Sequence, residues 1–418
     1  MNSIQAPAQP VLQPEISTFQ ERLLLFILSV IQFTHIMDFM IMVPLGPRLI
    51  DVFDISTRQF SFLVSAYTFS AGISGFASAF FIDRFDRKTA LIVLYFGFTL
   101  GTFACALSPN YYFLLTARTV TGLFGGILGA LIYAIVGDTI PAERRGRAMG
   151  IVMASFAIAS VAGVPFGLFL ADQFDWHAPF FLLAAMSLVV WVAAFKAIPA
   201  MRKHLQHQQH RSPMMVITQV LNNPNQLWAL GLMMMLMMAG FGIIPLLSTY
   251  MVKNVGFSQS QLAYIYLTGG SVSFFSSIIV GRLSDKYGKS RIFIIAAVLS
   301  LIPIAIITNL SRTPIPIALS VFAFFFIFTN GRMVPAMALI TSSVLPQQRG
   351  SFMSINSSVQ SVAAGVAAFL AGLVVYESPT TGELMNYPLV GYCSMVAVLI
   401  CIFIVRKIKP VAEEVKGR

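Results

Sequence analysis

The chain has 418 residues, of which 57% are hydrophobic and 10% are charged, and its mean hydropathy is +0.80. Soluble domains carry about 25% charged residues, so this composition excludes an ordinary soluble protein. The formal net charge of +11 would suit a nucleic-acid partner, but the placement of the basic residues, described below, excludes one.

Apolar runs recur along the whole chain, and each is long enough to cross a hydrocarbon core of about 30 Å as a helix. These runs do not alternate as the strands of a membrane barrel do. The sequence therefore predicts an all-α membrane protein with twelve transmembrane helices in two six-helix bundles related by pseudo-two-fold symmetry. The predicted spans are 22–46, 59–81, 88–108, 111–137, 147–170, 177–197, 225–251, 261–281, 291–309, 315–342, 353–376 and 387–405.

A polar break at residues 198–224 divides the spans into six and six. It contains His204, His207 and His210 among basic residues, and we interpret it as a solvated linker rather than a metal site. The predicted organisation is a cytoplasmic tail (1–21), a first bundle (22–197), the linker, a second bundle (225–405) and a cytoplasmic tail (406–418). The first tail lacks the features of a cleaved signal peptide, so we expect the first span to stay as an anchor.

Basic residues gather on one side of the predicted spans. With both termini on that side, 21 of the 27 Lys and Arg residues lie there, 4 lie on the other side and 2 lie within spans. Such a bias orients membrane proteins with their basic side in the cytoplasm. We therefore expect cytoplasmic termini, a bacterial inner membrane, and the lipid bilayer and a small-molecule substrate as partners.

The two halves share loop sequences. Residues 83–88 follow the second span and residues 281–289 follow the eighth, and both contain an aspartate among basic residues. The pattern Arg-Gly-x-x-Met occurs at 145–149 and again at 349–353. This repetition indicates an internal duplication, which is typical of transporters whose halves rock around a central site. One chain already holds both halves, so a monomer is sufficient.

The first loop resembles the motif Gly-x-x-x-Asp-Arg-x-Gly-Arg-Arg/Lys of the major facilitator superfamily. It supplies Asp83, Arg84, Arg87 and Lys88, while Ala79 and Asp86 replace the motif's two glycines. The resemblance implies that these residues form a charge relay that gates the cytoplasmic side, with Asp285 at the matching place in the second half. Orienting charges without a gating role are the alternative.

Two span motifs are similar to those of that family's twelve-span drug:proton antiporter branch. Arg118-x-x-x-Gly122 resembles an element associated with proton coupling. The segment 163–167 resembles the antiporter motif: Gly163 and Gly167 allow close helix approach, and Pro165 favours a bend. These three residues are therefore candidates for conformational gating, with tight packing alone as the alternative.

Ionisable side chains in mid-membrane cost roughly 2.5–3.5 kcal/mol on insertion scales, so they mark functional sites. Asp38, Arg118 and Arg332 lie deep in spans 1, 4 and 10. The duplicated half has Ala239 at the position of Asp38, so the acid does not serve a shared folding need. In the resembling fold these spans line the central cavity, which places the three residues around one space.

We expect Asp38 and Arg118 to couple transport to protons, because alternate pairing and separation would load and release a proton. Arg332, His35 and Tyr250 are the candidate substrate-binding residues. Static ion pairing and plain packing are the alternatives.

The function expected is export of small amphipathic or apolar compounds by alternating access, driven by a proton gradient. An organic-anion or metabolite carrier with Arg332 as counter-ion, or an uncoupled facilitator, is the alternative. The sequence contains no phosphate-binding loop and no His-Glu-x-x-His motif, so we expect neither an enzyme nor a bound cofactor or metal.

Overall fold

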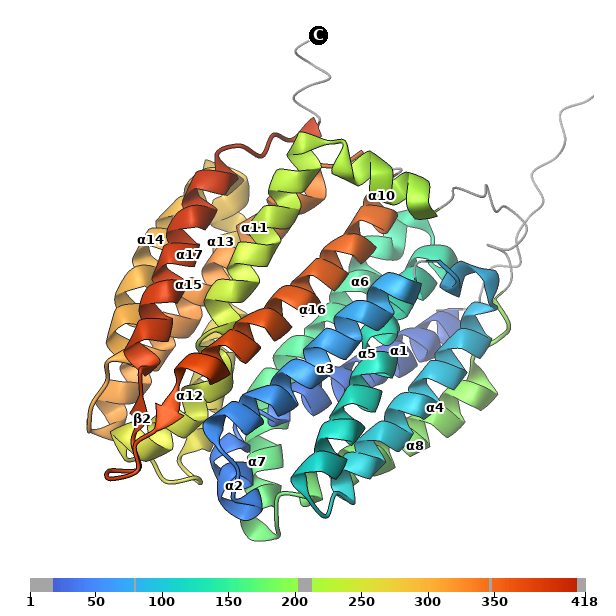
Figure 1. Ribbon diagram of the computed structural model, residues 1–418. Coiled ribbons are helices and arrows are strands. Elements are labelled where there is room, and N and C mark those ends of the chain that lie inside the picture. Colours follow the sequence, from blue (N-terminus) through green and yellow to red (C-terminus); the bar gives the residue numbers. More distant parts are fainter. Residues whose placement is uncertain (1–17, 79, 202–212, 346–347, 412–418) are drawn as a thin grey trace, which may run out of the picture.

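The computed structural model describes residues 18–78, 80–201, 213–345 and 348–411, and nearly all of them are helical (Figure 1). Twelve helices in these ranges are long and apolar enough to cross a membrane. The predicted all-α architecture with twelve spans is confirmed.

The first half holds six spans and two short irregular helices. In chain order its elements are α1 (Thr18–Ile41), α2 (Gly46–Phe53), α3 (Thr57–Ser78), η1 (Ile82–Arg84), α4 (Arg87–Ala106), α5 (Tyr111–Thr139), α6 (Ala142–Ile158), the π-helix η2 (Ala159–Gly163), α7 (Val164–Gln173) and α8 (Ala178–Ala197).

The second half repeats this plan and adds a small hairpin before its last helix. Its elements are α10 (Pro213–Leu221), α11 (Pro224–Phe241), α12 (Ile244–Tyr250), the π-helix η3 (Met251–Val255), α13 (Leu262–Tyr287), α14 (Lys289–Thr308), α15 (Ile315–Ser342), α16 (Arg349–Val374), β1 (Tyr376–Glu377), β2 (Leu384–Met385) and α17 (Tyr387–Val405). Helix α10 lies in the predicted linker, whose histidines fall outside the described residues, as do most of both tails.

Three spans are broken, and proline accompanies each break. The first span stops at Ile41 and restarts as α2, because Pro44 has no N–H to continue the helix. The seventh span breaks between α11 and α12 in the same way, next to Pro245. In the fifth span, Pro165 withdraws a donor from the preceding turn, which takes the wider π form of η2.

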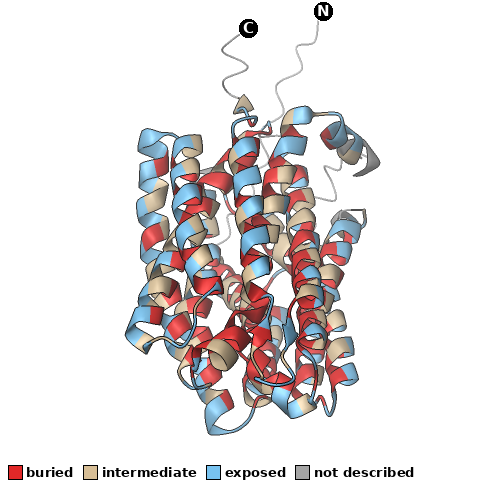
Figure 2. Cartoon of the chain, turned by 60° about the vertical axis from the view of Figure 1, so that its left-hand side comes forward, coloured by how far each residue is buried: buried red, intermediate tan, exposed pale blue. Residues whose placement is uncertain are grey.

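Apolar side chains cover the outside of the bundle as well as its interior. Figure 2 shows buried residues along the inner faces of the helices and exposed ones along the outer faces. Many of the exposed side chains are large and hydrophobic, such as Val189 and Phe275 at 69% and 64% exposure. Such a surface suits lipid tails rather than water.

The two halves meet along two matching pairs of helices. Helices α3 and α16 lie side by side along their length (Figure 1), with the rings of Phe62 and Phe369 stacked at 5.2 Å. Helix α13 packs on η2 and α7, where Gly270 lies against the backbone of Ser160. In the duplication, α3 corresponds to α13 and the fifth span corresponds to α16. These two interfaces are therefore related by the pseudo-two-fold symmetry of the halves.

Within the first half, α5 touches α3 backbone to backbone. A Cβ atom on Gly122 would overlap the carbonyl of Tyr67, and one on Gly126 would overlap the carbonyl of Ala71. These glycines therefore set the distance between the two helices.

This contact predicts a stability difference between two glycines of α5. Gly126→Ala is expected to lower the free energy of unfolding by about 1–3 kcal/mol, because the helices must move apart. Gly137→Ala is the control, since no atom lies within 4 Å of its added Cβ; it is expected to be neutral or to stabilise by up to about 1 kcal/mol. Thermal unfolding of the purified protein in detergent measures both, and equal midpoints would contradict the packing.

Candidate functional site

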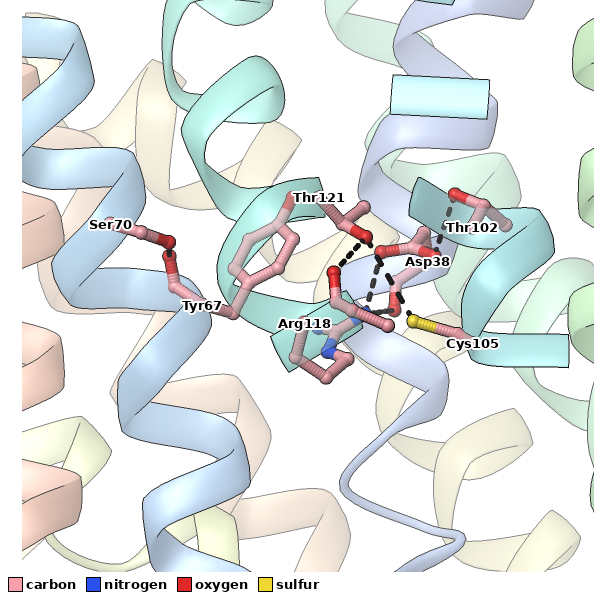
Figure 3. A network of polar contacts seen from close by, with 8 residues as sticks. Asp38, Tyr67, Ser70, Thr102, Cys105, Arg118 and Thr121 are labelled. Carbon is pink, nitrogen blue, oxygen red and sulfur yellow. Dashed lines mark hydrogen bonds and ion pairs between the residues drawn. The ribbon is translucent and has the colours of Figure 1, made fainter. Parts of the chain in front are cut away.

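A fully buried ion pair joins α1 to α5. The side chains of Asp38 and Arg118 are 0% and 1% exposed, and Nη1 of Arg118 lies 2.7 Å from Oδ2 of Asp38 (Figure 3). The same Nη1 also donates to the backbone carbonyl of Asp38 at 3.2 Å. Asp38 and Arg118 therefore lie together, as the sequence predicts.

Two more helices complete the surroundings of the pair. Thr102 of α4 donates its hydroxyl to Oδ1 of Asp38 at 3.1 Å, so both carboxylate oxygens accept hydrogen bonds (Figure 3). The ring of Tyr67, from α3, lies under the Arg118 guanidinium with its centroid 4.3 Å from Cζ. A cation over an aromatic face is stabilised by the ring quadrupole. Four helices of the first half therefore hold one charge pair.

His35 lies one helical turn before Asp38 and reaches toward α5. Its ring meets Phe98 edge-on at 5.7 Å, and its Nδ1 is buried without a hydrogen-bond partner among the described residues. A Cβ on Gly125 would lie 3.0 Å from Nε2 of His35 and 2.8 Å from the hydroxyl of Tyr67. Glycine at this position lets both polar tips approach α5.

Arg332 and Tyr250 are not brought to the pair. Arg332 of α15 is buried in the second half, where its Nη1 donates to the hydroxyl of Ser300 on α14 at 3.2 Å. Tyr250 stacks on Tyr387 at 4.3 Å and donates its hydroxyl to the carbonyl of Leu310. The sequence predicts that Arg332 shares one space with Asp38, whereas its described hydrogen bond is to α14 within the second half. The substrate-binding roles of Arg332 and Tyr250 stay predictions.

The first loop is tied down within the first half. Arg87 is buried and its Nε donates to Oδ2 of Asp138, at the end of α5, at 3.0 Å. Asp86 caps α4 by accepting from the backbone of Lys88, and it also accepts from the backbone of Met201 at 3.1 Å. Asp86, which stands where the family motif has a glycine, therefore connects the loop to the segment after α8.

The other candidate gating charges lie at the surface. Arg84 and Asp285 are exposed, and Asp285 forms no ion pair within the described part of the chain. The side chain of Asp83 falls outside the described residues. The gating role of these residues stays a prediction.

Residues 163–167, the segment that resembles the antiporter motif, pack directly on α1. A Cβ on Gly163 would lie 2.8 Å from Sδ of Met37, and one on Gly167 would lie 2.7 Å from Cδ1 of Ile41. The π turn before Pro165 therefore touches the stretch of α1 that carries the buried acid. A change in the bend would act on the ion pair through this contact.

The structure adds residues that the sequence did not single out. Thr102 gave no signal, because hydroxyls that bond to their own helix are common in apolar spans. Phe39 lies 5.4 Å from the ring of Tyr67 and 5.9 Å from that of Phe241, which belongs to the second half. Groups of three or more His, Cys, Asp or Glu able to hold a metal are absent from the described residues.

The sequence is similar to those of known membrane transporters. The chain matches the sequence profile described as Major Facilitator Superfamily over residues 28–279 and 229–418. An uncharacterized MFS-type transporter, YceJ of Bacillus subtilis (strain 168), is 25% identical over 357 residues, covering 84% of this chain and 88% of YceJ. The multi-drug resistance efflux pump PmrA of Streptococcus pneumoniae serotype 4 is 24% identical over 345 residues, covering 80% and 84%.

Solved structures show the same fold. A D-xylose-proton symporter has a TM-score of 0.74 at 15% identity, over 91% of this chain and 97% of its own. A bacterial homolog to the human lysosomal transporter Spinster, in an inward-facing and unoccupied conformation, has a TM-score of 0.71 at 16% identity, over 93% and 96%. The predicted fold of two six-helix bundles is confirmed.

The buried pair predicts a recovery of stability on double substitution. Arg118→Met is expected to cost about 3–5 kcal/mol, because it leaves a buried carboxylate unpaired. Replacing both members, in Asp38→Leu/Arg118→Met, is expected to recover most of that loss. Unfolding in detergent measures the cycle, with Arg147→Met at an exposed position as the control for a lost cation. A double variant less stable than Arg118→Met would contradict the pairing.

Proposed function

Because this chain belongs to the major facilitator superfamily and is an integral, multi-pass membrane transporter, we propose that it exports small amphipathic or apolar compounds in exchange for protons. The observation that carries the proposal is the Asp38–Arg118 pair at full burial. Export is supported by the similarity to the efflux pump PmrA.

The pair supplies a way to link a proton to a helix movement. Ionised Asp38 holds Arg118 and Thr102, and so ties α1 to α5 and α4. A proton on the carboxylate removes its charge and weakens both contacts, because hydrogen bonds to charged groups are the strong ones. The protonated and ionised forms then favour different helix arrangements, which is the requirement for coupling.

Alternating access requires contacts between the halves that open and close. At the end of the molecule that holds α2, Arg48 of the first half donates to Oε1 of Gln259 in the second at 2.9 Å. Nη2 of the same arginine also lies 3.5 Å from Oδ1 of Asp172, in an ion pair within the first half. We propose that the Arg48–Gln259 contact breaks when that end opens, while the exposed Arg48–Asp172 pair, worth about 0–1 kcal/mol, stays within the first half.

We place the protein in a bacterial inner membrane as a monomer, with both termini in the cytoplasm. The many similar transporters of Bacillus subtilis support the bacterial membrane, and the bias of basic residues supports the orientation.

The anion-carrier alternative would use Arg332 as the counter-ion of the substrate. The described hydrogen bond of Arg332 is to Ser300, and it adds no support to that alternative.

Asp38→Asn is expected to abolish uphill transport, because an amide cannot take up or release the proton. It also leaves Arg118 without its counter-charge, at a cost of about 3–5 kcal/mol, so its unfolding in detergent is measured alongside to check that the variant is folded. Proteoliposomes with an imposed pH gradient and a panel of radiolabelled uncharged and charged amphipathic compounds measure this. Wild-type protein should accumulate at least one compound against its gradient, and Asp38→Asn should only equilibrate it.

Asp51→Asn is the matched control, since Asp51 is exposed on α2 and lies outside the buried pair. It should accumulate the compound as the wild type does. Undiminished uphill transport by Asp38→Asn would exclude this carboxylate as the coupling group.

A further inference from the structure

The charge at the buried pair restricts what can bind beside it. Among the described acidic side chains, Asp38 alone is buried, and both of its oxygens already accept hydrogen bonds. Arg118 keeps its charge at every accessible pH. The pair therefore carries no net charge when Asp38 is ionised and one positive charge when Asp38 holds a proton.

Neither state favours a cation. In the ionised state an incoming cation meets a carboxylate whose charge is already balanced by Arg118, and it must compete with Arg118 and Thr102 for that group. In the protonated state it meets an uncompensated guanidinium in a region of low dielectric, where like charges repel strongly. An uncharged ligand avoids both costs.

Aromatic rings from both halves lie next to the pair. Phe39 follows Asp38 in α1, and its ring lies 5.9 Å from that of Phe241 at the end of α11 and 5.4 Å from that of Tyr67. Phe39 and Phe241 are only partly buried. Flat apolar molecules pack well on such rings, in offset or edge-on geometry.

Two neutral polar groups beside these rings lack partners among the described residues. They are the hydroxyl of Tyr67, whose residue is 4% exposed, and Nδ1 of His35. Both side chains approach α5 at Gly125. Buried polar groups normally have hydrogen-bond partners, so these two groups offer a ligand one or two hydrogen bonds without any charge.

We propose that the transported compounds are uncharged aromatic molecules with a hydrogen-bonding group, held against the rings of Phe39 and Phe241 and anchored by Tyr67, and that lipophilic cations are discriminated against. The inference rests on the proposed transport function only in taking the bound compound as the cargo. It narrows the proposed substrates from amphipathic or apolar compounds in general to flat, uncharged aromatic molecules.

Three probes with the same ring system test the charge preference. Isothermal titration of purified protein in nanodiscs at pH 7, corrected with empty nanodiscs, compares 2-naphthol, 2-naphthoate and 2-naphthyltrimethylammonium. The uncharged naphthol should bind most tightly, and the cation about tenfold or more weakly, because it gains no compensating charge.

Single substitutions test the location. Tyr67→Phe should weaken 2-naphthol about fivefold, the value of one net hydrogen bond, and leave naphthalene unchanged. Phe39→Leu should weaken both ligands, whereas Phe26→Leu, at an exposed position of the same helix, should weaken neither. Melting temperatures of all three variants check that each is folded.

Tighter binding of the cation or of 2-naphthoate, or no binding of any probe, would overturn the proposal. An equal effect of Phe39→Leu and Phe26→Leu would overturn its location. The titrations use no gradient, so this selectivity can hold even if Asp38→Asn still transports uphill, and the proton coupling can hold even if the cation binds best.

Discussion

The Asp38–Arg118 ion pair is the interaction on which the centre of this protein depends. Both charges are withdrawn from water, and a single unpaired charge there would cost about 3–5 kcal/mol. The first half is arranged to avoid that cost: α4 supplies a hydroxyl, α3 supplies an aromatic face, and glycines let α5 approach closely. Under the proposed coupling, a proton on Asp38 weakens its contacts with Arg118 and Thr102.

The scaffold is symmetric while its chemistry is not. The contacts of α3 with α16 and of α13 with the fifth span follow from the duplication and form two equivalent interfaces between the halves. The second half has Ala239 where the first has Asp38, and its own buried arginine, Arg332, bonds to Ser300 instead. Rings of Phe39 and Phe241 connect the charged half to the other half. Through Tyr67, these rings form a continuous line of contacts from the second half to Arg118.

The sequence predicted the number of spans and the duplication, because membrane thickness fixes the length of an apolar run. It also identified Asp38 and Arg118, because charges in apolar runs are rare enough to stand out. It did not predict which way helices face. Outer faces here carry many large apolar side chains, so no polar side marks the rotation of α15 about its axis. For that reason the sequence placed Arg332 beside Asp38, whereas Arg332 donates to Ser300 of α14.

The central claim is that Asp38 exchanges a proton as the transporter changes state. Infrared difference spectroscopy of the purified protein, taken between high and low pH, reports the carbonyl band of protonated carboxyl groups directly. The exposed carboxyl groups contribute to this band in every variant. We predict an additional component, from a carboxyl group withdrawn from water, that is present in the wild type and in Asp51→Asn and absent in Asp38→Asn. The same component in all three proteins would contradict the claim, because the proton would then reside on another group.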